Sequence, residues 1–244
     1  MLVKSQVKYI QSLSQKKSRD EEGVFIAEGP KIINELLSTP NIQLQQLYAL
    51  SEWIQQQPQT LAASAIEVSA HELERLSQLQ TPNQVIGVFR KPVFSKITSY
   101  HHRLSIVLDT IQDPGNLGTI VRCADWFGIQ TVIGSRECAD VFSPKVVQST
   151  MGSISRVQVL YEDLDTFMEQ HKDIPSYAAT LHGTGLYEMQ PVKEGFLLIG
   201  NESKGIREEL IARCRHRITI PRIGHAESLN AAVATGIILS HIAR

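Results

Sequence analysis

Three segments of the sequence place polar side chains that can do chemistry next to glycine or proline, each directly after an apolar run. The first segment is LDTIQDPGNLGTIVRCADWFG, residues 108–128, in which residues 113–116 predict a tight turn before a helix at 118–128. Asn116 presents an amide, Arg122 lies in the first turns of that helix, and the free N–H groups of a helix N-terminus suit an anion. An ordinary turn with a surface arginine is the alternative interpretation.

The second segment, FLLIGNESKG at residues 196–205, ends an apolar strand in Gly200, Asn201 and Glu202. Glycine at a strand end lets another group approach the backbone closely. The pattern lacks the GxxxxGK[ST] sequence of a nucleoside-triphosphate loop. The HGTG sequence at residues 182–185 likewise differs from the GxGxxG of dinucleotide-binding proteins.

The third segment, ITIPRIGHAESLNAAVATG at residues 218–236, predicts a strand, a loop and a helix. Ser228 is a natural N-cap for that helix. Asn230 has a poor helix propensity two residues later, which indicates another role. His225 together with Ser228 could form a hydrolase pair, but the GxSxG sequence of a nucleophilic serine is absent.

The elements around these segments alternate between strand and helix, which predicts an open, mostly parallel α/β sheet covered on both faces. Ligands of such sheets bind at the carboxyl ends of the strands. The predicted strands lie at 104–109, 130–134, 156–161, 176–180, 196–200 and 216–221, and the predicted helices at 118–128, 143–154, 162–171, 208–214 and 228–243.

A smaller α/β module is predicted before this region, and it includes a capping box from Ser69 to Glu72. Residues 91–103 have weak periodicity and are interpreted as a linker. We therefore expect two domains, at residues 1–97 and 104–244. His101 and His102 in the linker are adjacent, so on a strand they would point to opposite faces, and no metal site is expected.

The composition is that of an ordinary globular protein: 244 residues, 42% hydrophobic and 20% charged. No apolar run approaches the ~18 residues that cross a bilayer, and the N-terminal residues lack the apolar core of a secretory signal. The three cysteines form no CxxC pair, so neither a disulfide framework nor a zinc site is indicated. A cytoplasmic location is expected.

The formal net charge of −1 taken alone disfavours a nucleic-acid partner. Basic residues nevertheless cluster in residues 1–19, which contain no acidic residue, and again in residues 213–222. Such clusters are either solvated surfaces or RNA contacts. The candidate RNA-binding residues are Lys4, Lys8, Lys16, Lys17, Arg19 and Arg122.

Together, the three segments resemble the three motifs of the SpoU, or TrmH, family of RNA 2′-O-ribose methyltransferases, in the same order and across residues 104–244. The sequence VFIAEGPKIINELL near the N-terminus resembles the substrate-binding domain of such enzymes, which is similar to ribosomal proteins of the L30e and L7Ae type. This second resemblance covers a shorter pattern.

The resemblance implies a SPOUT-type α/β catalytic domain with a deep trefoil knot, S-adenosylmethionine as cofactor and a homodimer. It also implies an active centre and a cofactor site. The active-centre residues are Asn116, Arg122, Glu202, Ser228 and Asn230, and the cofactor residues are Thr180, Leu181, Gly183, Gly200, Asn201, Glu202, Ile220, Ser228, Leu229 and Asn230.

The implied reaction is attack of a ribose 2′-hydroxyl on the methyl group of the cofactor. Arg122 would bind the neighbouring phosphate and polarise the hydroxyl, because an arginine with a pKa above ~12 rarely loses its proton. Asn116 would hold the ribose or Arg122. Glu202 would orient Asn116 or Arg122. Ser228 and Asn230 would shape the loop around cofactor and acceptor.

The RNA substrate is expected to be a structured ribosomal RNA, with guanosine favoured, because the N-terminal module indicates a target larger than one tRNA arm. A tRNA ribose is the alternative. A non-catalytic RNA-binding protein is a second alternative, which the intact polar residues of all three segments disfavour. A dehydrogenase is disfavoured by the missing GxGxxG pattern.

Overall fold

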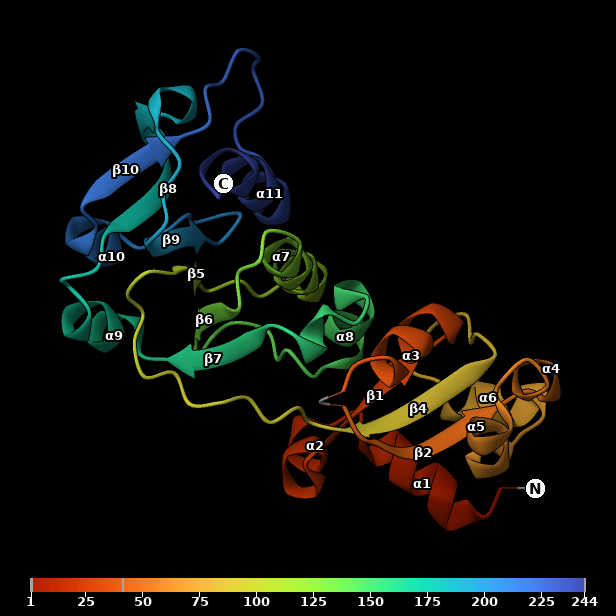
Figure 1. Cartoon of the computed structure of the whole chain (residues 1–244). Coiled ribbons are helices and arrows are strands. Elements are labelled where there is room, and N and C mark those ends of the chain that lie inside the picture. Colours follow the sequence, from red (N-terminus) through yellow and green to blue (C-terminus); the bar gives the residue numbers. More distant parts are fainter. Residues whose placement is uncertain (1, 41, 244) are drawn as a thin grey trace. The chain divides into compact units, whose positions relative to one another are not determined.

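A computed structural model describes residues 2–40 and 42–243 of the chain. The chain divides into two compact units, of which the first contains Met1–Phe94 and Asp140–Ser155 and the second contains Ser95–Ala139 and Arg156–Arg244 (Figure 1). A segment from the middle of the chain therefore belongs to the first unit. The domains predicted at residues 1–97 and 104–244 place residues 140–155 in the second domain, whereas the compact units place them in the first.

The first unit is built on a four-stranded sheet in the order β1-β4-β2-β3. Strands β1 and β2 each pair antiparallel with β4, and β3 pairs parallel with β2. The core combines apolar side chains of the strands with those of α1 and α6, such as Ile10, Leu76 and Val88. The strands are β1 (Val24–Glu28), β2 (Leu44–Ala49), β3 (Ile66–Glu67) and β4 (Val85–Arg90), and the helices are α1 (Lys4–Ser12), α2 (Lys16–Glu22), α3 (Pro30–Leu37), α4 (Ser51–Ile54), α5 (Gln59–Ser64), α6 (Ala70–Leu76) and α8 (Pro144–Thr150).

The capping box predicted at the start of α6 is confirmed. The backbone N–H of Glu72 donates to the Ser69 hydroxyl at 3.2 Å, and the Ser69 backbone N–H donates to the Glu72 carboxylate at 3.0 Å. The Glu72 carboxylate also accepts from the backbone N–H of Leu2 at 2.8 Å, so this local signal ties the N-terminal residues to α6.

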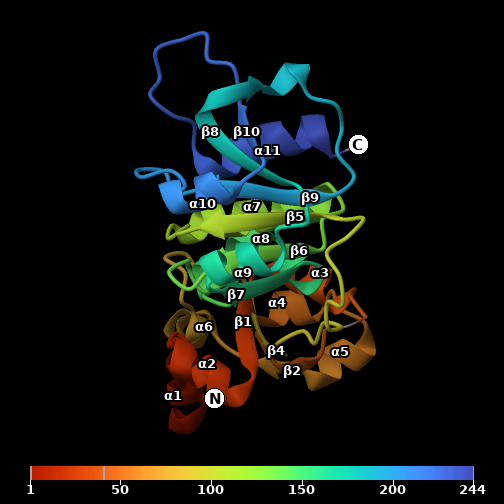
Figure 2. The ribbon, with the colours of Figure 1, turned by 90° about the vertical axis from the view of Figure 1, so that its left-hand side faces the viewer.

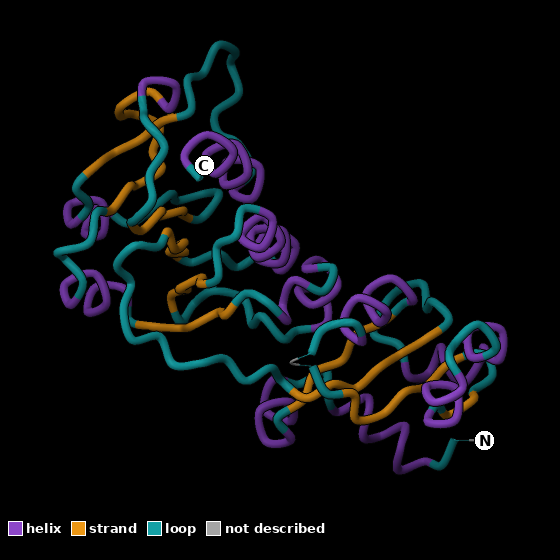
Figure 3. Tube along the Cα trace, viewed as in Figure 1, coloured by secondary structure: helices purple, strands orange, loops and turns teal. Residues whose placement is uncertain are grey.

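The second unit confirms the predicted parallel α/β sheet. Its six strands lie in the order β10-β8-β9-β5-β6-β7, and every neighbouring pair is parallel (Figure 2). Helices α7 and α11 lie on one face of this sheet and α9 and α10 on the other (Figures 1 and 3). The strands are β5 (Leu104–Asp109), β6 (Thr131–Ser135), β7 (Gln158–Glu162), β8 (Ser176–Gly185), β9 (Gly195–Gly200) and β10 (His216–Thr219), and the helices are α7 (Pro114–Trp126), α9 (Leu164–Gln170), α10 (Glu208–Arg213) and α11 (Ala231–Ile242), with 3-10 turns at Ser153–Ser155 in the first unit and Leu186–Glu188 in the second.

The core of the second unit explains the apolar runs of its strands. Val107 of β5 and Leu198 of β9 are buried beneath α9 and α10, which contribute Phe167 and Leu210. Strands covered on both faces read as continuous apolar segments rather than as alternating ones. Among the described residues, no helix has the length and apolar character to cross a membrane.

Among the element boundaries that differ from the sequence prediction, three bear on the candidate site. Helix α7 begins at Pro114, four residues earlier than predicted, because the Asp113 side chain accepts from the backbone N–H of Asn116 and acts as N-cap. Helix α11 begins at Ala231, and its N-cap is Asn230 rather than Ser228. Strand β8 runs for ten residues, five beyond the predicted end, because its last part pairs with β10.

Candidate active site

The predicted site residues follow strands that end at one edge of the six-stranded sheet. Strands β5 and β9 run in register, so that their last residues, Asp109 and Gly200, are directly paired. Strand β8 lies on the other side of β9. The carboxyl ends of three neighbouring strands therefore meet where ligands of such sheets bind.

Asn116, Glu202 and Asn230, which we call the polar triad, form a continuous chain of hydrogen bonds across the three motifs. The Asn230 Nδ2 donates to the Asn116 Oδ1 at 2.8 Å, and the Asn116 Nδ2 donates to the Glu202 carboxylate. Asn116 uses both ends of its amide in this chain, and Asn230 uses its Nδ2, so these contacts define the orientation of both amides. The structure thus brings together three of the five residues predicted for the active centre, and their catalytic roles stay a prediction.

Helix starts hold two members of the triad. Asn116 lies in the first turn of α7, where its backbone N–H donates to the Asp113 carboxylate at 2.8 Å. Asn230 caps α11, since its Oδ1 accepts from the backbone N–H groups of Ala232 and Val233 at 3.0 and 3.2 Å. The Asn230 side chain therefore does two jobs, with its oxygen on the helix and its nitrogen on Asn116. These two contacts explain why an asparagine stands at position 230 although asparagine has a poor helix propensity.

Arg122 and Ser228 do not join the polar triad within the part of the chain that the structure describes. Arg122 lies on α7 with an exposed side chain, and it has no hydrogen bond or ion pair to any described residue. Burial raises the pKa of the neighbouring Cys123 thiol, and the charge of Arg122 opposes that shift. The guanidinium is consequently available to an anionic ligand, and Ser228 is exposed in the loop before α11.

The residues predicted to hold the cofactor from β8 lie where this strand departs from β10. Arg217 pairs with Ala178, but the next residue, Ile218, pairs with Thr184, so residues 179–183 are looped out relative to β10. The Thr180 hydroxyl closes this loop by donating to the His182 carbonyl at 2.6 Å. The Thr219 hydroxyl donates to the Leu181 carbonyl at 3.2 Å.

Glycines are required at two of these positions by close backbone approach. A Cβ atom on Gly183 would lie 2.5 Å from the carbonyl oxygen of Arg217, and one on Gly200 would lie 2.2 Å from the carbonyl carbon of Gly205. Neither contact is sterically acceptable. The first contact brings β8 against β10, and the second folds the loop after β9 back onto its own strand.

Asn201 uses its side chain inside the protein. Its Nδ2 donates to the Thr110 carbonyl at 2.9 Å, while its Oδ1 accepts from the backbone N–H groups of Ser203 and Lys204 at 2.9 and 3.3 Å. Both ends of the Asn201 amide therefore have partners inside the protein, and its predicted cofactor contact stays a prediction.

The exposed apolar side chains of this region fit an adenosyl group. Leu181 is 66% exposed and Leu229 is 45% exposed, and they belong to the two segments in which the resemblance places the cofactor. All of residues 221–230 are exposed, and Ile220 before them is half-buried. A bound nucleoside would bury these aliphatic side chains, and the burial of apolar surface favours binding. The residues present therefore fit S-adenosylmethionine.

The basic residues at the N-terminus divide into exposed lysines and one interior arginine. Lys4, Lys8, Lys16 and Lys17 are exposed. Arg19 is only 2% exposed; its guanidinium donates to the carbonyls of Leu13 and Ser14 and forms an ion pair with Asp140. The prediction that Arg19 contacts RNA is therefore wrong, because its guanidinium is buried inside the first unit and paired with Asp140.

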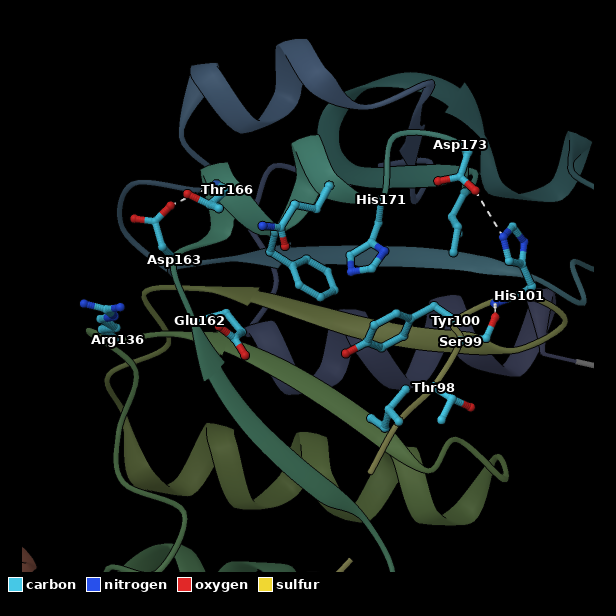
Figure 4. Close-up of a pocket in the computed structure, with 14 residues that line it drawn as sticks. Thr98, Ser99, Tyr100, His101, Arg136, Glu162, Asp163, Thr166, His171 and Asp173 are labelled. Atoms are coloured by element: carbon cyan, nitrogen blue, oxygen red, sulfur yellow. Dashed lines mark hydrogen bonds and ion pairs between the residues drawn. The ribbon is translucent and has the colours of Figure 1, made fainter. Parts of the chain in front are cut away.

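A cavity of about 670 Å³ lies elsewhere in the second unit, lined by the linker residues 97–101 together with α9 and β7 (Figure 4). None of the predicted site residues lines it. Some of its polar groups have partners within the unit, since His101 pairs with Asp173 at 3.1 Å and Asp163 caps α9. No group of histidine, cysteine or acidic residues suited to a metal ion occurs in residues 2–40 and 42–243.

Comparison with known proteins agrees with the three motifs and the fold. The model of the SpoU rRNA methylase family matches residues 103–240, and that of the MRM3-like substrate-binding domain matches residues 4–87. The chain is 30% identical to the 23S rRNA (guanosine(2553)-2′-O)-methyltransferase RlmP of Bacillus subtilis, over 97% of this chain and 95% of the relative.

Solved structures extend this similarity to both units. An RNA methyltransferase of the TrmH family from Porphyromonas gingivalis is 37% identical with a TM-score of 0.83, covering 99% of this chain and 98% of that one. An rRNA methyltransferase from Sinorhizobium meliloti, solved with AdoMet bound, is 31% identical with a TM-score of 0.84, covering 99% and 95%.

The family match covers more than half of the chain, and the RlmP similarity covers nearly all of it. The motifs, the parallel sheet and the polar triad lie within the matched region. The chain therefore belongs to the SpoU rRNA methylase family, as an RNA 2′-O-methyltransferase that takes its methyl group from S-adenosylmethionine.

Proposed function

We propose that this enzyme methylates the ribose 2′-hydroxyl of a guanosine in 23S ribosomal RNA. The similarity to RlmP supports the guanosine, because it extends over both units rather than over the catalytic part alone. A relative from Streptomyces viridochromogenes, 30% identical over 80% of this chain, is a 23S rRNA uridine 2′-O-methyltransferase. The two relatives thus agree on the RNA and differ on the base.

The observation that carries the proposed mechanism is the polar triad. It joins one residue from each motif and lies beside the segments proposed to hold the cofactor. S-Adenosylmethionine, when bound, supplies a methyl group on a positively charged sulfonium. Leu181 and Leu229 would cover its apolar part, and the backbone at residues 180–183, Gly200 and Ile220 would bind its polar atoms.

The protein then has to align the acceptor and handle one proton. The bond that would form joins the ribose 2′-oxygen to the methyl carbon, the bond that would break joins that carbon to sulfur, and the hydroxyl proton would pass to water. Alignment of two reactants is worth about 7–11 kcal/mol of a barrier. We assign alignment of the ribose to Asn116, whose amide is fixed by Glu202 and Asn230.

Arg122 is proposed to bind the phosphate next to the reactive ribose and to polarise the 2′-hydroxyl. Its guanidinium is exposed and has no partner among the described residues, which leaves its planar set of donors free for a phosphate. A positioning role fits its chemistry better than proton abstraction, since an arginine stays protonated. Ser228 is proposed to shape the loop around cofactor and acceptor.

The domain proposed at residues 1–97 would hold the structured RNA through the exposed lysines at positions 4, 8, 16 and 17, and the domain at 104–244 would carry the chemistry. We also propose a homodimer through α7 and α11. These two helices pack on each other, and they expose Trp126 (83%) and Val233 (51%). The trefoil knot is proposed because it belongs to the SPOUT-type fold that the resemblance implies. The cytoplasm is the proposed location.

The test is to map 2′-O-methylated nucleotides in total RNA from a strain that lacks the gene. The proposal expects one guanosine of 23S rRNA to lose its methyl group and to regain it when the gene is restored. A lost site in a tRNA would overturn the RNA assignment, and a lost site on another base would overturn the guanosine. Calorimetry with S-adenosylmethionine alone tests cofactor binding independently of any RNA.

A further inference from the structure

Asp109, at the end of β5, is a carboxylate buried far more deeply than the residues of the polar triad. Its side chain is 2% exposed. A buried carboxylate is costly unless hydrogen bonds compensate the loss of water. Here the Arg207 backbone N–H donates to Oδ2 at 2.8 Å, the Arg207 Nε donates to Oδ1 at 3.1 Å, and the Thr110 hydroxyl donates to Oδ1 at 3.2 Å.

The residue after Asp109 makes a second connection to the same part of the chain. Thr110 has a φ of 60°, a left-handed conformation that is unusual for a β-branched residue. Its carbonyl accepts from the Asn201 side chain at 2.9 Å, and its backbone N–H donates to the Ser135 hydroxyl at 3.1 Å. Such backbone strain persists only where the surroundings hold it.

These contacts attach both ends of one loop to one dipeptide. The loop runs from residue 201 to residue 207, with Asn201 bound to Thr110 at its start and Arg207 bound to Asp109 at its end. Asn201 and Gly205 also exchange two backbone hydrogen bonds, of 3.1 and 2.8 Å, which close the loop. Glu202 is the residue of this loop that enters the polar triad.

We propose that Asp109 and Asn201 are positioning residues, which hold the 201–207 loop so that the Glu202 carboxylate meets the Asn116 amide. The proposal rests on the roles assigned above to the polar triad. Asp109 acts through Arg207 and Asn201 acts through Thr110, and neither touches the reacting atoms. Without these attachments the loop loses its fixed ends, and Glu202 no longer orients Asn116.

A double-mutant cycle separates this role from a general effect on folding. Asp109→Asn keeps the size of the side chain but turns one amide N–H group toward donors of Arg207. We expect the initial rate of methyl transfer to fall by about 10- to 100-fold, as for a small misplacement of a catalytic group. In the Glu202→Gln background the same change is expected to cost less than about threefold, because the group that Asp109 positions is already lost.

The assay follows incorporation of labelled methyl from S-adenosylmethionine into total RNA of the deletion strain, with the full chain. Arg207→Ala provides a second variant if Asp109→Asn fails to fold, since the Arg207 side chain is 46% exposed and its backbone N–H remains. The matched control is Arg156→Ala, which removes the ion pair with Asp125 at 2.8 Å in the same unit and is expected to leave the rate unchanged.

The outcomes distinguish the two proposals. If Glu202→Gln alone methylates at the normal rate, the role assigned to the polar triad fails. If Glu202→Gln is slow, but Asp109→Asn and Arg207→Ala slow both backgrounds by the same factor, the triad stands and the positioning role is overturned. A normal rate in Asp109→Asn overturns it as well.

Discussion

Asn230 donates a 2.8 Å hydrogen bond to Asn116 across 114 residues of chain, while the other end of its amide caps α11. One side chain thus connects the start of the last helix with the start of α7. The two ends of this amide can be changed separately, because aspartate and asparagine cap helices equally well.

Asn230→Asp is expected to cost less stability than Asn230→Ala and to slow methyl transfer. The aspartate keeps the acceptor for Ala232 and Val233 but loses the Nδ2 donor to Asn116. Asn230→Ala loses both functions and should also destabilise the protein by about 0.5–2 kcal/mol. Chemical denaturation and initial rates measure the two effects. Equal stability of the two variants would contradict the capping role.

Arg122→Lys is expected to slow methyl transfer by about 10- to 100-fold without changing the midpoint of thermal unfolding. Lysine keeps the charge but not the planar, two-pronged donor geometry proposed to bind the phosphate. Stability should be unaffected, because the Arg122 side chain is exposed and lacks a hydrogen-bond or ion-pair partner in residues 2–40 and 42–243. A nearly normal rate at all pH values would refute the positioning role.

Gly183→Ala is expected to weaken binding of S-adenosylmethionine and to destabilise the protein. The added Cβ would lie 2.5 Å from the Arg217 carbonyl oxygen, so β8 must move away from β10. Gly224→Ala is the matched control, since its Cβ meets no atom within 4 Å. Calorimetry and denaturation report the two effects. Normal cofactor affinity in Gly183→Ala would show that this approach of the strands does not shape the site.

Glu72 should make folding stability depend on pH in the acid range. The backbone hydrogen bond from Ser69, followed by that from Leu2, lowers the pKa of Glu72 to about 2. A lowered pKa stabilises the folded protein fully above the unfolded value of about 4.3, and this stabilisation is lost as the pH falls toward 2. Glu72→Gln should reduce the slope of unfolding free energy against pH between these values. An unchanged slope in Glu72→Gln would contradict the contribution of Glu72 to stability.

Arg19→Ala is expected to destabilise the protein by about 3–5 kcal/mol, because it leaves Asp140 and the carbonyls of Leu13 and Ser14 without their donors. Lys8→Ala should leave stability within about 0.5 kcal/mol and lower the salt dependence of RNA binding by about one phosphate contact. Denaturation and binding titrations at several salt concentrations distinguish them. A large loss of stability in Lys8→Ala would show that Lys8, like Arg19, has a structural role.

Local patterns predicted the elements of this protein well where the signal lies within a few residues. The Ser69–Glu72 capping box needs only neighbours along the chain, and the apolar strands of the second unit follow from burial on both faces. Helix boundaries were less predictable. Ser228 and Asn230 are both good N-caps, and the contact between Asn230 and Asn116 accompanies the start of α11 at Ala231.

The sequence by itself determined the alternation of strands and helices, the three motifs and their family. Only the tertiary structure decided which side chains meet. Arg19 looks like one more solvated charge until Asp140, 121 residues away, pairs with it in the interior. Asp109 looks like the end of a strand until β9 places Gly200 beside it and the following loop returns Arg207. Such partners are set by strand order and packing, which bring together residues that no local pattern relates.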